Sequence, residues 1–303
     1  MAPIEVEGLS KYFGDIRAID DISFHVASGE VFGFLGPNGA GKTTTIRTLL
    51  GLLAPTSGSA TVLGADIRHE SELIEARRNI GYLPDHLGFH DELTGTEILD
   101  YHASVKGDTR REELLERFTP PVDRAVRGYS SGNKRMLGII QAFMHDPDLV
   151  ILDEPTSGLD PLKQGVFHEF IREERDRGTT IFFSSHILSE VRRVCDRVGI
   201  LRAGQLVELE DIDTLLNRSG KRVIVQTSDE GKEALAALDG AIDVHDFEEG
   251  IQFIYTGHYS TLFQELAKHD IYEADISEPP LEDIFLHYYG ENNISDQEVT
   301  TDA

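Results

Sequence analysis

The sequence predicts an α/β protein built as a mostly parallel β-sheet with helices between its strands, followed by a smaller α+β unit. A glycine-rich loop joins an apolar strand to a helix at residues 36–44. Apolar strands alternate with helical segments between residues 149 and 201, as they do in a parallel sheet. From residue 216 the expected order becomes strand–helix–strand–strand–helix–strand, which is the ferredoxin-like order.

The N-terminal part is predicted to form paired strands, because Ile4–Glu7 and Ile22–Val26 alternate apolar and polar residues. The stretch from about residue 90 to 145 differs from it. Glu97–Ala103 and Arg110–Phe118 have helical spacing, and few strands are apparent around them. We therefore expect a helical subdomain at about residues 90–145.

The predicted domains are residues 1–215 and 216–290. Elements of the second domain are expected as strands at Arg222–Thr227, Ala241–Phe247, Ile251–Tyr255 and Ile271–Ile276, and helices at Glu230–Leu238 and Ser260–Lys268. A final helix is predicted at Leu281–Tyr289, after two prolines. Residues 291–303 are polar and are predicted to form a disordered tail.

Composition excludes several classes of protein. No apolar stretch approaches the ~18–20 residues of a membrane-spanning helix, and the N-terminus lacks the features of a secretory signal. Cys195 is the only cysteine, which excludes an internal disulfide and fits a cytosolic protein. The net charge is −26, and without a basic stripe the sequence predicts no nucleic-acid partner. So acidic a surface suggests a halophilic protein in a salt-rich cytosol, or alternatively a basic partner.

Residues 36–44 predict a binding site for a nucleoside triphosphate. They match the G-x-x-x-x-G-K-[ST] phosphate loop and read Gly36, Pro37, Asn38, Gly39, Ala40, Gly41, Lys42, Thr43, Thr44. The glycines let backbone N–H groups turn toward the phosphates, Lys42 reaches the β- and γ-phosphates, and Thr43 ligates Mg²⁺. A helix that begins at Thr44 adds partial positive charge at the same place.

Two acids follow the apolar strand Val150–Leu152. An acid at the carboxyl end of a parallel strand lies in the crevice where α/β sheets bind ligands. Asp153 is predicted to hold Mg²⁺, and Glu154 to act as general base toward the attacking water. The alternative is structural, with a strand-end acid capping the next loop.

With these motifs the chain resembles the ATP-binding subunits of ABC transporters over residues 1 to about 215. Tyr129–Asn133 is similar to the family's signature sequence, Ser157–Asp160 to its D-loop, and Ser184–His186 to its switch-histidine segment. The resemblance implies a P-loop NTPase core of the ABC ATPase type with a helical subdomain, followed here by the small ferredoxin-like domain.

Site residues are implied by the same resemblance. Besides the phosphate loop, the ATP-binding residues would be Phe13, Ser130, Ser131, Gly132, Asn133 and Asp160. Phe13 matches the aromatic residue that stacks on adenine, although its neighbour Tyr12 is an alternative. His186 would hold the γ-phosphate and the attacking water, and so act with Glu154 in catalysis.

Two positions depart from the family pattern. Asp85 stands where the family has a glutamine that contacts Mg²⁺ and water, and its charge adds repulsion beside a γ-phosphate. We interpret it as a subtype difference and keep it as a metal-site residue. In the signature, Ser131 and Asn133 replace a glycine and a glutamine, but Ser130 and Gly132 are retained, so we expect activity.

The resemblance implies an ATP-binding and ATP-hydrolysing subunit that powers a transporter. Glu278–Phe285 is similar to the end of exporter-type ATPases for drugs, bacitracin and sodium. Its partners would be a second ATPase subunit, in a homodimer or a pair that encloses two ATPs, and separate transmembrane permease subunits. It would be cytoplasmic and peripheral on the inner face of the cell membrane. The alternatives are a soluble ABC ATPase and a nucleotide-dependent switch without transport, and the cargo stays open.

Overall fold

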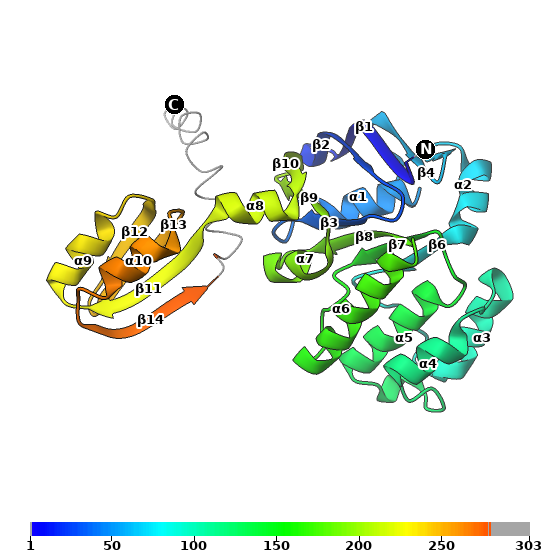
Figure 1. The fold of residues 1–303 in the computed structure, drawn as a ribbon. Helices are drawn as coiled ribbons and strands as arrows, with labels where there is room; N and C mark the ends of the chain where they lie inside the picture. Colours follow the sequence, from blue (N-terminus) through cyan, green and yellow to red (C-terminus); the bar gives the residue numbers. More distant parts are fainter. Residues whose placement is uncertain (1, 278, 280–303) are drawn as a thin grey trace, which may run out of the picture. The chain divides into compact units, whose positions relative to one another are not determined.

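A six-stranded sheet organises the first part of the chain (Figure 1). Its strands follow the order β10 (Gln205–Asp211), β9 (Arg197–Arg202), β3 (Val31–Leu35), β8 (Thr180–Ser185), β7 (Leu149–Asp153) and β6 (Ile80–Leu83). Every neighbouring pair is parallel except β10 with β9. All residues of β3, β7 and β8 are buried, as expected for parallel strands covered on both faces. The predicted α/β core is confirmed.

The computed structural model describes residues 2–277 and residue 279. The chain divides into two units, Met1–Asp211 and Ile212–Ala303. The boundary expected after residue 215 falls inside α8 (Ile212–Ser219), the first element of the second unit. The helix expected at Leu281–Tyr289 and the tail expected at 291–303 lie outside the described residues.

A second, antiparallel sheet packs on the first one. It consists of β2 (Ile16–Val26), β1 (Ile4–Phe13), β4 (Ser57–Val62) and β5 (Ala65–Asp66), in that order. The aromatic ring of Phe24 on β2 lies 5.5 Å from the rings of Phe32 and Phe34 and 6.1 Å from that of Phe182. One hydrophobic core therefore joins both sheets and fixes the strands that carry the candidate site.

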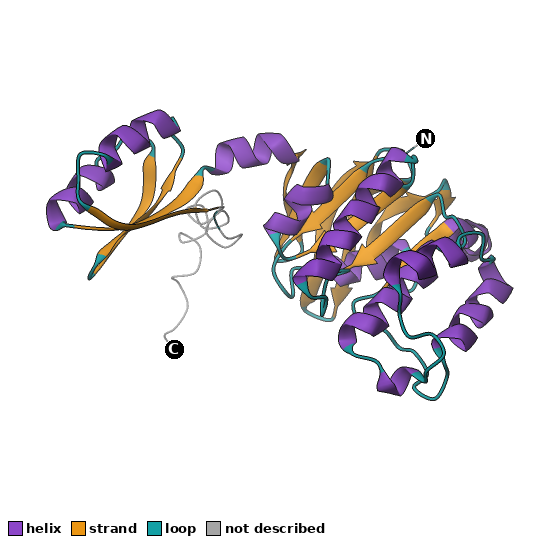
Figure 2. Ribbon diagram, turned by 60° about the horizontal axis from the view of Figure 1, so that its bottom comes forward, coloured by secondary structure: helices purple, strands orange, loops and turns teal. Residues whose placement is uncertain are grey.

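Helices surround the sheets of the first unit (Figure 2). They are α1 (Lys42–Leu49), α2 (Glu70–Ala76), α3 (Gly95–Lys106), α4 (Arg111–Phe118), α5 (Ser131–Phe143), α6 (Pro161–Asp176) and α7 (Leu188–Val194), with the short 3₁₀ helices η1 (Arg77–Asn79) and η2 (Val126–Gly128). The helix α1 contacts strands of both sheets, and α7 contacts β3 and β8. No helix in the described part of the chain is long and apolar enough to cross a membrane.

Helices fill the region in which few strands were expected. A capping box starts α3, since Thr94 accepts a hydrogen bond from the Glu97 backbone and the Glu97 carboxylate accepts one from Thr94. Buried Arg110 precedes α4 and binds the buried Glu174 of α6 through two hydrogen bonds of 2.7 Å. This ion pair connects the helical region to the core.

The second unit has the element order that the sequence predicts. After α8 it consists of β11 (Lys221–Thr227), α9 (Asp229–Ala236), β12 (Ala241–Phe247), β13 (Gly250–Tyr255), α10 (Tyr259–Leu266) and β14 (Ile271–Ser277). Its strands form an antiparallel sheet in the order β12-β13-β11-β14. Val223, Phe253 and Leu262 lie in a hydrophobic core of its own.

Candidate functional site

The phosphate loop connects β3 to α1 at the carboxyl end of the six-stranded sheet (Figure 1). The helix begins at Lys42, two residues before the expected start at Thr44. Gly41 caps it with a φ of 108°, and a Cβ there would overlap the backbone oxygen of Ala18 on β2. Only glycine fits this turn, which aims the first N–H groups of α1 out of the loop.

Lys42 lies along this loop with its charge directed at an acid. Its Nζ donates hydrogen bonds to the Gly36 oxygen at 2.7 Å and to the Pro37 oxygen at 3.2 Å. The same Nζ lies 3.3 Å from Glu154 Oε1. The lysine predicted to bind phosphates and the acid predicted to activate water therefore share one location.

Asp153 ends β7 and is fully buried. It accepts hydrogen bonds from Thr43 Oγ1 at 2.9 Å and from Ser184 Oγ at 3.1 Å. Burial raises the pKa of the Asp153 carboxyl, the two hydroxyl groups oppose that shift, and the charges of Asp85 and Glu154 add to it. A carboxylate next to a threonine hydroxyl offers the oxygen ligands that Mg²⁺ prefers, so Thr43 and Asp153 fit that ion.

Glu154 lies between two partners at the end of the same strand. Its Oε2 lies 2.8 Å from His186 Nδ1, while Oε1 faces Lys42 and makes no hydrogen bond to the described residues. The backbone φ of Glu154 is 50°, a left-handed value that costs a non-glycine residue about 1–2 kcal/mol. The surrounding structure holds this angle, and it leaves one carboxylate oxygen for a substrate or water.

The sequence analysis did not identify Glu190, which connects the two catalytic loops. Its buried carboxylate accepts hydrogen bonds from Thr156 Oγ1 at 2.5 Å and from Ser185 Oγ at 2.8 Å. Thr156 follows Glu154, and Ser185 precedes His186. Glu190 lies in the first turn of α7, where an acid is ordinarily explained by the helix dipole, so the sequence held no distinct signal for it.

Asp85 follows β6 and approaches the site from the side of the helical region. Its Oδ1 lies 3.7 Å from Arg135 Nη2, and its Oδ2 lies 3.7 Å from His86 Nε2. Its charge acts on Asp153, which agrees with the expected nearness to the metal site. Arg135, which belongs to α5, was not among the predicted site residues.

The signature and D-loop residues meet at two neighbouring helix starts. Ser130 caps α5 by accepting a hydrogen bond from the Asn133 backbone at 3.2 Å, and Asp160 caps α6 through the Lys163 backbone at 3.0 Å. A Cβ at Gly132 would lie 3.1 Å from the Gly158 oxygen, so the two segments are in close contact. Both helix starts carry N–H groups suited to an anion.

Phe13 lies near the tip of the β1–β2 hairpin and is 47% exposed. Lys11 Nζ lies 5.0 Å from the centre of its ring. Tyr12, the alternative, donates a hydrogen bond from its hydroxyl to Asp20 at 2.5 Å. The exposed ring of Phe13 is thus free to stack on a base, while the Tyr12 hydroxyl is engaged.

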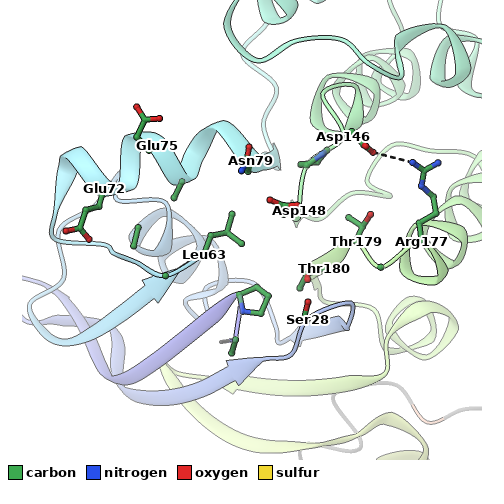
Figure 3. Close-up of a pocket in the computed structure, with 17 residues that line it drawn as sticks. Ser28, Leu63, Glu72, Glu75, Asn79, Asp146, Asp148, Arg177, Thr179 and Thr180 are labelled. Atoms are coloured by element: carbon green, nitrogen blue, oxygen red, sulfur yellow. Dashed lines mark hydrogen bonds and ion pairs between the residues drawn. The ribbon is translucent and has the colours of Figure 1, made fainter.

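A cavity of about 870 Å³ opens at the opposite, amino end of the parallel sheet (Figure 3). Asn79, Asp148 and Thr180, from the starts of β6, β7 and β8, line it. None of the predicted site residues belongs to it. The candidate site therefore lies away from this cavity.

Comparison with known proteins places the chain among transporter ATPases. The family model described as ABC transporter matches residues 19–157. The bacitracin transport ATP-binding protein BcrA of Bacillus licheniformis is 37% identical over 96% of this chain and 98% of its own length. A solved ATP-binding subunit of an ABC transporter is 32% identical, with a TM-score of 0.63, over 70% of this chain and 91% of its own. A dimeric cassette in a post-hydrolysis state with ADP and Pi has a TM-score of 0.64 at 21% identity, over 69% of this chain and 98% of its own, and supports the fold alone.

Proposed function

The chain belongs to the family of ABC transporter ATP-binding proteins, and we propose that Glu154 is the general base of its ATP hydrolysis. The observation that carries the proposal is the arrangement around this carboxylate. One oxygen contacts His186 at 2.8 Å, and the other faces Lys42 at 3.3 Å without a hydrogen bond in the described part of the chain. A water at that oxygen would lie beside the lysine that binds the γ-phosphate.

In this mechanism the phosphate loop binds the substrate. Lys42 exchanges its contacts with loop oxygens for phosphate oxygens, and the N–H groups at the start of α1 bind the same charge. Thr43 and Asp153 would hold Mg²⁺, which when bound supplies positive charge for phosphoryl transfer. Asp85 extends the acidic wall on that side.

The chemical step then uses Glu154 and His186. Glu154 accepts a proton from the water while the water oxygen bonds to the γ-phosphorus and the bond to the β-phosphate oxygen breaks. The products are ADP and inorganic phosphate. His186 orients the water and donates a hydrogen bond to the γ-phosphate, and Glu190 keeps both loops in register through Thr156 and Ser185.

The ATP site is completed by a second ATPase subunit in this proposal, in a homodimer or a paired assembly. Ser130 and Gly132 stand at the start of α5 and Asp160 at the start of α6, where N–H groups favour an anion. ATP bound to one phosphate loop would meet these helix starts on the other subunit. Binding would favour the closed dimer and hydrolysis would release it.

We assign the chain to an exporter that works with separate transmembrane permease subunits. The support is the bacitracin transport relative, which matches it over almost the whole length of both chains. The subunit would lie on the cytoplasmic side of the membrane. A switch without turnover is the second candidate, because the acid at position 85 lies close enough to affect Asp153.

ATP hydrolysis by the purified chain in molar KCl, with Glu154→Gln beside wild type, tests the proposal. We expect the variant to lose turnover by about 1,000-fold or more while binding ATP and accumulating as a dimer. Glu75→Gln, on the exposed face of α2, is the matched control and should behave as wild type. ATP binding without turnover in the wild type, alone or with a permease, would support the switch.

A further inference from the structure

Arg135 is a buried cation where three segments of the proposed site meet. Its side chain extends from α5 and is 4% exposed as a residue. The guanidinium donates to the Pro84 oxygen at 2.9 Å, the Asp85 oxygen at 2.7 Å and the Ser157 oxygen at 3.3 Å. A single side chain thus connects the signature helix, the loop at position 85 and the D-loop.

The same guanidinium faces the acids of the site. Its Nη2 lies 3.7 Å from Asp85 Oδ1. Burial lowers the pKa of Arg135, and the charges of Asp85, Asp153 and Glu154 oppose that shift. Arg135 and Lys42 are therefore two cations set against three carboxylates before any nucleotide adds its own negative charge.

The fork of the arginine suits both tasks. Its planar guanidinium donates in several fixed directions, so it can bind two neighbouring carbonyl oxygens and a third on another segment at once. A lysine ammonium has the charge but lacks this fixed geometry. An uncompensated carboxylate at position 85 would repel the phosphates of ATP.

We propose that Arg135 is a positioning residue for ATP turnover, which neutralises Asp85 and ties the position-85 loop and the D-loop to the signature helix. The proposal rests on the ATP site described above and adds a residue to it. It assigns two separable effects to one side chain: the charge sets ATP affinity, and the fork sets the turnover rate.

The two effects predict different behaviour for two substitutions. Arg135→Gln removes the charge and most of the fork, so the KM and Kd for ATP should rise about tenfold and kcat should fall. Arg135→Lys keeps the charge, so the KM should stay within about twofold of wild type while kcat falls about tenfold.

The decisive experiment adds Asp85→Asn to the Arg135→Gln chain. If Arg135 acts by neutralising Asp85, removing that carboxylate should return the KM and Kd for ATP to within about twofold of wild type, with kcat still low. A purely structural arginine would give no such recovery, because a second substitution in a damaged junction adds to the damage. Thermal unfolding of all four proteins separates affinity from loss of fold.

Two results would overturn the inference. The first is an Arg135→Gln chain whose ATP affinity equals that of wild type, or a double variant as weak as the single one. The second, which applies even if Arg135→Gln fails to fold, is an Arg135→Lys chain with wild-type kcat. Because ATP Kd is measured beside turnover, a wild type that binds but does not hydrolyse ATP contradicts the proposed catalysis and still tests the charge effect of Arg135.

Discussion

The two ends of the six-stranded sheet contrast sharply. At the carboxyl end, β3, β7 and β8 deliver the phosphate loop, Asp153 with Glu154, and His186 to one place. At the amino end a cavity of about 870 Å³ is also lined by polar side chains (Figure 3). There the ion pair of Asp146 with Arg177 spans 3.3 Å between side chains that are 51% and 48% exposed.

The difference lies in burial of charge and not in the size of the opening. A pair in contact with water contributes about 0–1 kcal/mol and has its hydration satisfied without a ligand. A buried carboxylate such as Asp153 is costly to keep, so its presence at the carboxyl end calls for a partner such as a cation. Opposed charges with few polar partners mark the functional end of the sheet better than volume does.

The sharpest test of this contrast is Asp153→Asn, where activity and stability should change in opposite directions. We expect hydrolysis to fall about 100-fold or more, since the residue is proposed to hold Mg²⁺. We also expect the Tm at neutral pH to rise, because burial raises the pKa of Asp153 and its ionised form weakens the fold.

The sign of the pH dependence follows from the raised pKa. Between the ordinary value of 3.8 and the higher folded value, the folded chain binds the proton more tightly, so the destabilising effect of Asp153 vanishes as the pH falls. Thermal unfolding from neutral to acidic pH should show the Tm difference between variant and wild type shrinking. A lower Tm for the variant at neutral pH would contradict the idea of a costly buried charge.

A smaller effect is expected for Glu190→Gln, which weakens the connection between the two catalytic loops. The amide keeps one acceptor oxygen, so one of the two hydroxyl contacts at Thr156 and Ser185 is disturbed. We expect kcat to fall about tenfold with ATP Kd unchanged, because the residue contacts loops and not phosphates. Equal kcat values in a steady-state assay would mean that the loops hold their geometry without it.

Phe13→Ala asks how far the site extends beyond the parallel sheet. Loss of a stacking ring costs about 1–3 kcal/mol per base, so we expect the KM for ATP to rise by roughly fivefold or more with kcat retained. Tyr12→Phe is the matched control, since it removes the hydroxyl bonded to Asp20 and leaves the Phe13 ring. Should the control weaken ATP and the alanine variant not, Tyr12 would be the adenine-stacking residue.

The least effect is expected at the amino end. Glu75→Gln breaks an exposed ion pair with Arg78 at 3.3 Å on the rim of the cavity. Stability should stay within about 0.5 kcal/mol of wild type and turnover should be unchanged. A substantial loss of ATPase activity in this variant would show that the cavity has a role and would remove the contrast between the two ends.

Sequence reasoning identified the parts of the site that local rules determine. The phosphate loop, Asp153 and Glu154 follow from a motif and from the carboxyl ends of apolar strands, and these residues lie together in the structure. The start of α1 was misplaced by two residues, because Gly41 caps the helix from a conformation that the letters do not display.

The residues that were missed act across distant parts of the chain. Arg135 binds Pro84 and Ser157, and Glu190 binds Thr156, so each contact exists only after the sheet and helices have packed. Neither side chain belongs to a repeating pattern or a motif that would set it apart beforehand. Local patterns thus predicted the groups expected to touch ATP, whereas folded packing was needed to find the groups that orient them.

The division into two units also bears on how such proteins diversify. Each unit is one continuous stretch of sequence, and the chain passes between them once, at Ile212. A single crossover in the gene at that codon would therefore exchange the whole C-terminal unit and leave every strand of the first unit intact. Solved cassettes that match only about 70% of this chain are the natural counterpart, because they match the fold without needing that second reading frame segment.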